Sequence, residues 1–181
     1  MKLNHVLLAG VISTVAFSTV ATAAPQIIFK GEVSGQTCTA SINGETDTIV
    51  LLPTVSTELL ANTGSTGGIT PFRVTIKDCE PDSADLAINT NFLGRNVTTN
   101  GTLGNTADTA NAAKNVSIQL MTSGNGGTAI NLSAGVTAVP GLVLKKDETS
   151  TSYDFGARYY SEGGATAGEV TSLAEYTLSY F

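Results

Sequence analysis

The stretch Val170-Thr-Ser-Leu-Ala-Glu-Tyr-Thr-Leu-Ser-Tyr-Phe181 closes the chain and sets the main constraint on its fold. From Ala174 onward, apolar and polar side chains alternate (Ala174, Tyr176, Leu178 and Tyr180 against Glu175, Thr177 and Ser179). This period of two is typical of a strand with one buried face. A sandwich strand normally pairs on both sides, and nothing follows this one to supply the second neighbour. We therefore expect either an open edge, which is an aggregation hazard, or a neighbour from another molecule.

A second alternating stretch, Pro25-Gln-Ile-Ile-Phe-Lys-Gly-Glu-Val33, lies near the other end of the chain. One set of positions is largely apolar, and a second set lies between them (Ile27, Phe29, Gly31 and Val33 against Ile28, Lys30 and Glu32). This pattern predicts a strand with one apolar face. Nothing obliges a strand at the extreme end of the mature chain to pair within its own domain.

Residues 1–23 are interpreted as a secretion signal. Lys2 gives a short basic start, residues 6–15 are mostly apolar, and Ala21-Thr-Ala23 matches the small-residue pattern of a cleavage site. A membrane anchor is the competing interpretation, but the apolar run is too short and too interrupted by Ser and Thr to span a bilayer. We expect cleavage before Ala24.

The remaining residues fit one domain, and their composition excludes several partners. Charged residues are 13 % of the chain, Trp is absent, and the formal net charge is −6 before the signal is removed. Nucleic acids and anionic membranes need clustered cations, and the basic doublet Lys145-Lys146 is followed directly by Asp147-Glu148. We therefore expect no nucleic-acid partner.

Two cysteines, Cys38 and Cys79, survive removal of the signal. An even number of cysteines in an exported chain predicts a disulfide, which would stabilise the fold by about 4 kcal/mol. A metal site is the competing interpretation. It is disfavoured because the chain has no CxxC spacing and its one histidine, His5, lies in the signal.

Short strand patterns recur along the chain, separated by Gly- and Asn-rich turns such as Asn43-Gly44. No helical period is convincing, and residues 56–62 could form one helical turn at most. We expect residues 62–68 to be loop, and residues 96–115 to be loop with one weak strand at 101–104. The expected strands are 37–42, 48–52, 71–79, 85–89, 115–121, 128–132, 142–144, 152–160 and the last stretch. This pattern predicts an all-β sandwich.

The mature chain carries little that could do chemistry. Without histidine it lacks the base of Ser-His-Asp and Cys-His catalysis, and paired cysteines leave no thiolate nucleophile. The acidic stretch 78–85 lacks the ligand pattern of a calcium loop, so a solvated turn is the better interpretation. The Gly clusters at 64–68 and 124–127 lack the features of a phosphate loop. We therefore expect no enzyme activity, no cofactor and no metal.

The two ends of the chain together resemble the chaperone–usher fimbrial subunits, or pilins, and are close to the type 1 major-subunit group. The resemblance rests on Phe29-Lys-Gly-Glu-Val33 ahead of a cysteine, on the pair Cys38 and Cys79, on the penultimate Tyr180, and on Gly168, fourteenth from the end. It covers essentially the whole mature chain, and the joint spacing of these features is more specific than any one of them.

The resemblance implies an incomplete immunoglobulin-like β-sandwich that lacks its final strand. It divides the chain into a signal (1–23), a donor-strand extension (24–36) and a pilin domain (37–181). It implies that Ile27, Phe29, Gly31 and Val33 are donor residues. A periplasmic chaperone would first lend a strand to an acceptor groove beside the last strand (Ala174, Tyr176, Leu178, Tyr180 and Phe181). At the outer-membrane usher, the N-terminal strand of another copy would then replace it.

On this interpretation the protein is a structural subunit of a bacterial surface fimbria that supports adhesion or biofilm formation. Two other interpretations stay open, a minor or adaptor subunit and a secreted carbohydrate-binding adhesin. The donor extension has only about ten residues before the first strand of the domain and is shorter than in type 1 major subunits, which leaves the choice between major and adaptor subunit open.

Overall fold

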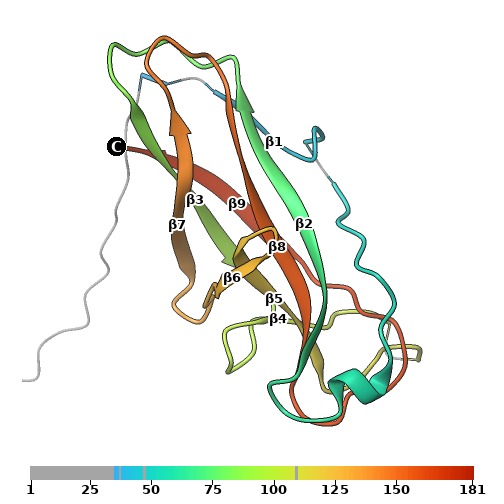
Figure 1. The fold of residues 1–181 in the computed structure, drawn as a ribbon. Helices are drawn as coiled ribbons and strands as arrows, with labels where there is room; N and C mark the ends of the chain where they lie inside the picture. Colours follow the sequence, from blue (N-terminus) through green and yellow to red (C-terminus); the bar gives the residue numbers. More distant parts are fainter. Residues whose placement is uncertain (1–34, 37, 47, 109) are drawn as a thin grey trace, which may run out of the picture. The chain divides into compact units, whose positions relative to one another are not determined.

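A computed structural model describes residues 35–36, 38–46, 48–108 and 110–181. The elements in chain order are β1 (Thr39–Ile42), η1 (Thr57–Leu60), β2 (Thr66–Lys77), β3 (Leu86–Gly94), β4 (Leu103–Gly104), β5 (Val116–Ser123), β6 (Gly126–Ala129), β7 (Val136–Leu144), β8 (Thr151–Ser161) and β9 (Ala174–Tyr180). The predicted all-β class is confirmed (Figure 1). In the part of the chain so described, no helix is long or apolar enough to cross a membrane.

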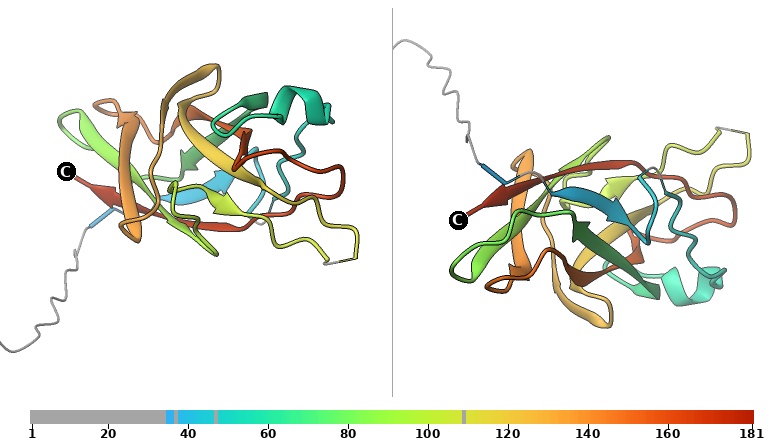
Figure 2. Two further views of the ribbon diagram at one scale, coloured as in Figure 1. Left: turned by 90° about the horizontal axis from the view of Figure 1, so that it is seen from below. Right: turned by 90° about the horizontal axis from the view of Figure 1, so that it is seen from above.

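The strands form two antiparallel sheets that pack face to face (Figure 2). One sheet has the order β1-β2-β8-β5-β4, with β6 also paired to β5, and the other has the order β7-β3-β9. This is an incomplete immunoglobulin-like sandwich, as expected. Since β9 pairs only with β3 among the described strands, the second sheet ends at β9.

Aromatic side chains from both sheets meet in the core. Phe72 of β2 and Phe155 of β8 are cross-strand partners, with stacked rings whose centroids lie 5.8 Å apart. Phe92 of β3 meets Phe155 edge-on at 5.2 Å. Aromatic pairs in these geometries stabilise a core beyond the area that they bury. The alternation of residues 72–76 therefore marked a real core strand.

The first hairpin forms at the turn expected from Asn43-Gly44. Both residues have positive φ, 51° and 90°, and Ile42 and Glu45 exchange two backbone hydrogen bonds across them. Such a turn favours Asn followed by Gly because both tolerate the left-handed region. The single helical turn expected within residues 56–62 is η1.

Several expected strand limits are wrong. Residues 62–68 are not all loop, because β2 begins at Thr66 and continues through a register shift between Gly67 and Thr70. β7 is nine residues long rather than the expected 142–144. Pro140 interrupts its apolar pattern, and proline is tolerated there because β7 is an edge strand with a register shift opposite Ile88 and Asn89.

The strand expected at residues 48–52 is not formed. The segment is extended but belongs to no sheet, and no backbone hydrogen bond joins residues 48–55 to another described residue. In Figure 1 this segment runs down the right-hand side toward η1. A strand pattern without such a ladder indicates a segment with no strand neighbour among the described residues.

Candidate functional site

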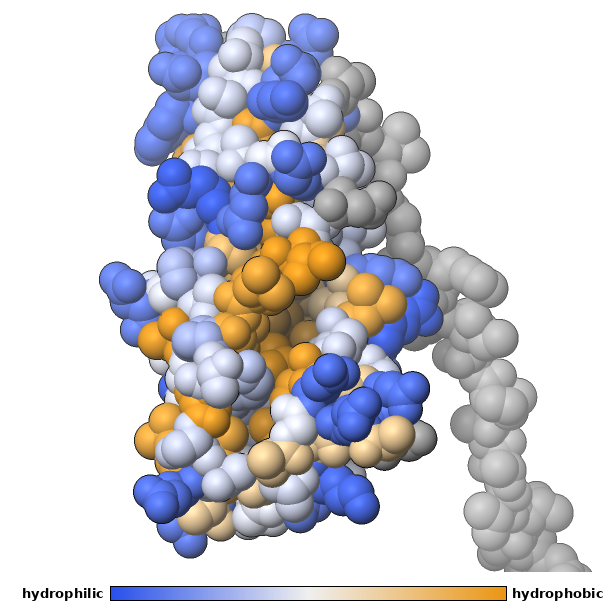
Figure 3. Space-filling model, turned by 90° about the vertical axis from the view of Figure 1, so that its right-hand side faces the viewer, coloured by the Kyte–Doolittle hydropathy of each residue, from blue (hydrophilic) through white to orange (hydrophobic). Residues whose placement is uncertain are grey.

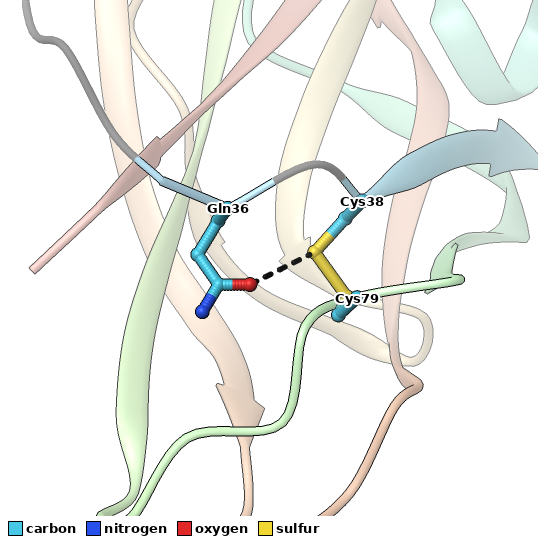
Figure 4. Close-up of a disulfide and its surroundings, with 3 residues drawn as sticks. All are labelled: Gln36, Cys38 and Cys79. Carbon is cyan, nitrogen blue, oxygen red and sulfur yellow. Dashed lines mark hydrogen bonds between the residues drawn. A yellow bond between two sulfur atoms is a disulfide. The ribbon is translucent and has the colours of Figure 1, made fainter.

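The expected disulfide joins Cys38, just before β1, to Cys79, just after β2 (Figure 4). The side-chain oxygen of Gln36 lies 4.0 Å from Sγ of Cys38. The bond closes a loop with a sequence separation of 41, which corresponds to about 4 kcal/mol of stabilisation on the chain-entropy model. It fixes the start of β1 beside β2, where the register pairs Thr39 with Lys77.

β9 places its apolar residues inward, as the alternation predicted. Ala174, Tyr176, Leu178 and Tyr180 pack against the core but remain only partly buried. Thr177 and Glu175 are exposed on the other face, and Arg95 holds Glu175 at 2.7 Å. The inner residues of an internal strand would be fully covered, so β9 borders a space that the described chain leaves open.

The segment 48–55 forms the opposite border. Val50 and Leu52 pack against the same core and are also partly buried, whereas Ile49 and Leu51 point outward. Two extended segments therefore flank one strip of half-covered core. Among the described residues neither has a strand partner on the side facing the strip. Figure 3 looks onto the side that carries 48–55 and shows a hollow lined with apolar residues.

We call this strip the groove, and two pockets lie beside its borders, one lined by β9 and the region of β1 and the other by the end of the segment 48–55 and the chain before β9. The first, of about 410 Å³, lies beside the second half of β9, at the disulfide end. Its lining residues come from β9 and from the region of β1: Cys38, Ala40, Thr46, Tyr176, Thr177, Leu178 and Tyr180. Three of the residues predicted for the acceptor groove therefore line one cavity together.

The second pocket, of about 390 Å³, lies where the chain approaches β9 and where η1 begins. The apolar lining residues include Val55, Leu60, Val116, Tyr159 and Val170, and Gly168 also borders it. The sequence patterns did not indicate Val50, Leu52, Val55 and Val170 as groove residues. The apolar run at residues 49–52 was the available signal, because an apolar extended segment without a partner strand exposes its side chains unless another surface covers them.

The backbone packing around position 168 explains why this residue is glycine. Its φ is 152°, and a Cβ atom there would lie 2.4 Å from the backbone nitrogen of Ala113 and 2.6 Å from the carbonyl oxygen of Asn111. The next residue, Glu169, donates its N–H to Asn111 O at 2.8 Å and accepts from Ala113 N at 2.9 Å. Glycine therefore lets the approach to β9 lie directly against residues 111–113.

The C-terminal residue, Phe181, is 71 % exposed. Its N–H donates to the carbonyl oxygen of Ala87 at 2.9 Å, so β9 stays hydrogen-bonded to β3 up to the last residue. The predicted donor residues Ile27, Phe29, Gly31 and Val33 lie outside the described residues.

Among the described residues, the carboxylate with the most side-chain hydrogen bonds, Glu162, does not line either pocket. Glu162 accepts hydrogen bonds from Ser117 at 2.7 Å, from Thr102 at 3.1 Å and from the side-chain amide of Asn100. Burial would raise the pKa of Glu162, but these hydrogen bonds outweigh burial, and the pKa lies below its ordinary value. The network ties the turn after β8 to β5 and to the loop before β4.

No metal-binding cluster appears within the described ranges. They contain no group of three or more His, Cys, Asp or Glu residues that could hold a metal ion. In the acidic stretch, the Asp85 carboxylate accepts a 2.7 Å hydrogen bond from Lys145 Nζ, which lowers the pKa of Asp85. Asp85 is therefore part of an exposed ion pair.

Comparison with known proteins identifies the family of this chain. The model of the family described as "Fimbrial protein" matches residues 27–180. The F17 fimbrial protein of Escherichia coli is 36 % identical over 157 residues, which cover 86 % of each chain. The major fimbrial subunit SMF-1 of Stenotrophomonas maltophilia is 37 % identical over 157 residues, covering 85 % of this chain and 90 % of the relative.

Solved structures share the fold at lower identity. The P pilus rod subunit PapA superposes with a TM-score of 0.54 at 13 % identity, covering 78 % of this chain and 99 % of PapA. A type I fimbria protein of Burkholderia pseudomallei gives 0.54 at 22 % identity, covering 80 % and 100 %. With the family match over nearly the whole chain, these findings show that the chain belongs to the fimbrial protein family.

Proposed function

We propose that the protein is a structural subunit of a bacterial surface fimbria, and that it polymerises by receiving a strand from a neighbouring copy in its groove. One observation carries the proposal. β9 and the segment 48–55 flank a strip of half-buried apolar side chains, and among the described residues neither has a strand partner on the side that faces this strip. An added strand would satisfy both backbone edges and cover the strip at once, which is the mode of β-augmentation.

The N-terminal extension 24–36 supplies a suitable donor. Its residues Ile27, Phe29, Gly31 and Val33 alternate with a period of two, as the walls of the groove do. Side chains at that spacing point to one face of a strand and can enter successive pockets. Large side chains at Ile27 and Phe29 would fill pocket volume, whereas Gly31 would fit a place where the floor leaves no room for a side chain.

This contact favours an open filament. The donor surface is a terminal strand and the acceptor surface is a groove, so the interface is heterologous and joins subunits head to tail. Such contacts extend indefinitely unless a rotation closes them into a ring. The disulfide supports the acceptor, because Cys38 itself lines the pocket beside Tyr180.

The route to the filament forms part of the proposal. Residues 1–23 would direct export and be removed. A periplasmic chaperone would cover the groove by lending a strand and would hold the carboxylate of the exposed Phe181. Exchange at an outer-membrane usher would then replace that strand, and the finished fimbria would support adhesion or biofilm formation. None of these steps needs a cofactor or a nucleic acid.

A minor or adaptor subunit is the second candidate. It is favoured by the minor fimbrial subunit HifD of Haemophilus influenzae, which is 32 % identical over 162 residues and is covered to 73 % of its length. Labelled antibody viewed by electron microscopy separates the two roles. Decoration along whole filaments indicates a shaft subunit, and decoration at one end indicates an adaptor.

A binding assay tests the proposed function. A labelled peptide covering Ala24–Gln36 is mixed with the chain from which residues 24–33 have been deleted. We expect tight binding that Gly31→Leu weakens at least about tenfold, because an added leucine overpacks a site that has no room for it. Glu32→Gln is the matched control, since position 32 belongs to the other face of the peptide. Equal binding by the wild-type and Gly31→Leu peptides, or no binding by either, contradicts the donor assignment.

A further inference from the structure

Ile49 and Leu51 form an unexplained apolar surface, which we call the outer ledge. They are 82 % and 81 % exposed, the highest values among the large hydrophobic residues that the structure describes. Their neighbours Val50 and Leu52 point inward and pack on the core. The ledge is therefore the outward face of the groove wall 48–55, and the inward pockets do not account for it.

The geometry of an added strand indicates which of its side chains would lie beside the outer ledge. A strand inserted between β9 and 48–55 would turn alternate side chains inward and the others outward. Outward side chains on adjacent strands lie about 5 Å apart and interact in pairs. On β9 the outward neighbours are polar (Glu175, Thr177 and Ser179), whereas on 48–55 they are Ile49 and Leu51. The outward face of the added strand thus meets an apolar wall on one side only.

The outward face of the N-terminal extension matches that asymmetry. Between the pocket-filling residues lie Ile28, Lys30 and Glu32, so one outward residue is aliphatic and the next has a four-carbon stem. A lysine can cover apolar surface with its stem while its ammonium group stays in water. Ile28 and Lys30 are two residues apart, as are Ile49 and Leu51.

We propose that Ile28 and the stem of Lys30, from a second copy of this chain, cover Ile49 and Leu51 when the groove is filled. The inference rests on the proposed function and extends it, because recognition then involves both faces of the donor strand. A donor with the same inward residues but a polar residue at position 28 would fit the pockets and still bind less well. The outer ledge would thereby help to select this chain's own extension over other donors.

Cross-linking in assembled filaments tests the contact on the full chain. The double variants Ile28→Cys with Ile49→Cys, and Ile28→Cys with Leu51→Cys, place thiols on the two outward faces. We expect a ladder of disulfide-linked oligomers on a non-reducing gel from at least one of them. Two controls should give no ladder: Ile27→Cys with Ile49→Cys, which pairs opposite faces, and Ile28→Cys with Val136→Cys, which uses an exposed residue of β7 at the other edge of the sheet.

The outcomes separate this inference from the proposed function. If the wild-type chain forms no filament, the proposed function fails and this inference fails with it. If filaments form and neither Ile28 pair cross-links, the ledge contact is wrong while strand addition stands. A cross-linked monomer would show that the chain's own extension covers the ledge, which overturns the assignment to a second copy.

A second measurement serves if the cysteine variants do not assemble. Ile28→Ser, Ile49→Ser and the double variant are compared by the time that filaments take to dissociate in denaturant. We expect each single change to shorten this time about threefold, and the double change to do little more, because both remove one contact. Val136→Ser should have no effect. If the two changes act independently, the fold-change in dissociation time of the double variant equals the product of the two single fold-changes. That result would overturn the proposal.

Discussion

β5 and β9 have similar alternating sequences and different surroundings. In β5, the inward residues Val116, Ile118 and Leu120 are at most 8 % exposed, because the strand pairs with β8 on one side and with β4 and β6 on the other. In β9 the inward residues stay partly exposed, because the strand pairs only with β3. The difference shows that one strand pattern can be satisfied within the chain or can leave a place for a strand from outside.

The outward faces differ as well. β5 buries Ser117 and Gln119, which face the Glu162 network and the Arg158 guanidinium, whereas β9 exposes Thr177 and Glu175. The sequence suggested ordinary half-buried strands in both cases. β5 is in fact buried on both faces over residues 116–121, so Ser117 and Gln119 are internal hydrogen-bonding groups.

The largest expected effect comes from the disulfide, which supports the open side of the molecule. Cys38→Ser combined with Cys79→Ser should lower the free energy of unfolding by about 4 kcal/mol. Urea unfolding followed by circular dichroism measures it. The yield of exported subunit should fall as well, because β1 borders the groove that a donor must find folded. Wild-type stability in the double variant would show that β1 is held by its ladder with β2 alone.

A matched pair of leucines tests the comparison itself. Leu120→Ala in β5 should cost about 3 kcal/mol, since it empties a site that is 5 % exposed in the core. Leu178→Ala in β9 should cost the isolated subunit about 1 kcal/mol, because its side chain is already partly in water. The order should reverse for binding of the Ala24–Gln36 peptide, which Leu178→Ala weakens and Leu120→Ala spares. Equal costs in the isolated subunit would mean that β9 is not an open edge.

The smallest expected effect concerns Glu162, which anchors the enclosed side of the molecule. The pKa of Glu162 is lowered in the folded state from its ordinary value of 4.5, so its ionised form stabilises the fold above that pH. The contribution is lost as the pH falls through the lowered pKa. Glu162→Gln should cost about 1 kcal/mol at pH 7, which is below the roughly 1.5–3 kcal/mol usual for hydrogen bonds to a charged group because the side chain is partly exposed. The difference in urea midpoint between the wild-type chain and Glu162→Gln should be smaller at acidic pH than at neutral pH. A difference that is the same at both pH values would refute the ionic role.

The sequence was sufficient to predict features that depend only on neighbouring residues. The Asn43-Gly44 turn and the alternation of β9 were predictable because each depends on a few consecutive residues. The pairing of residues 48–52 was not predictable, since whether an apolar extended segment has a neighbour depends on distant parts of the chain and, on our proposal, on another molecule. The role of Gly168 was recognisable only by resemblance, because its reason is the backbone of residues 111–113, more than fifty positions away.

Hydrogen exchange at β9 tests most directly the claim that one edge of this strand is open and accepts a strand from another molecule. In the chain without residues 24–33, alternate amides of β9 point away from β3 and should exchange within seconds to minutes, while the amides of β5 stay protected. Adding the Ala24–Gln36 peptide in excess should slow exchange at those β9 amides by at least about a hundredfold and leave β5 unchanged. If β9 is as protected as β5 without the peptide, or gains no protection with it, the groove is not an acceptor for this strand.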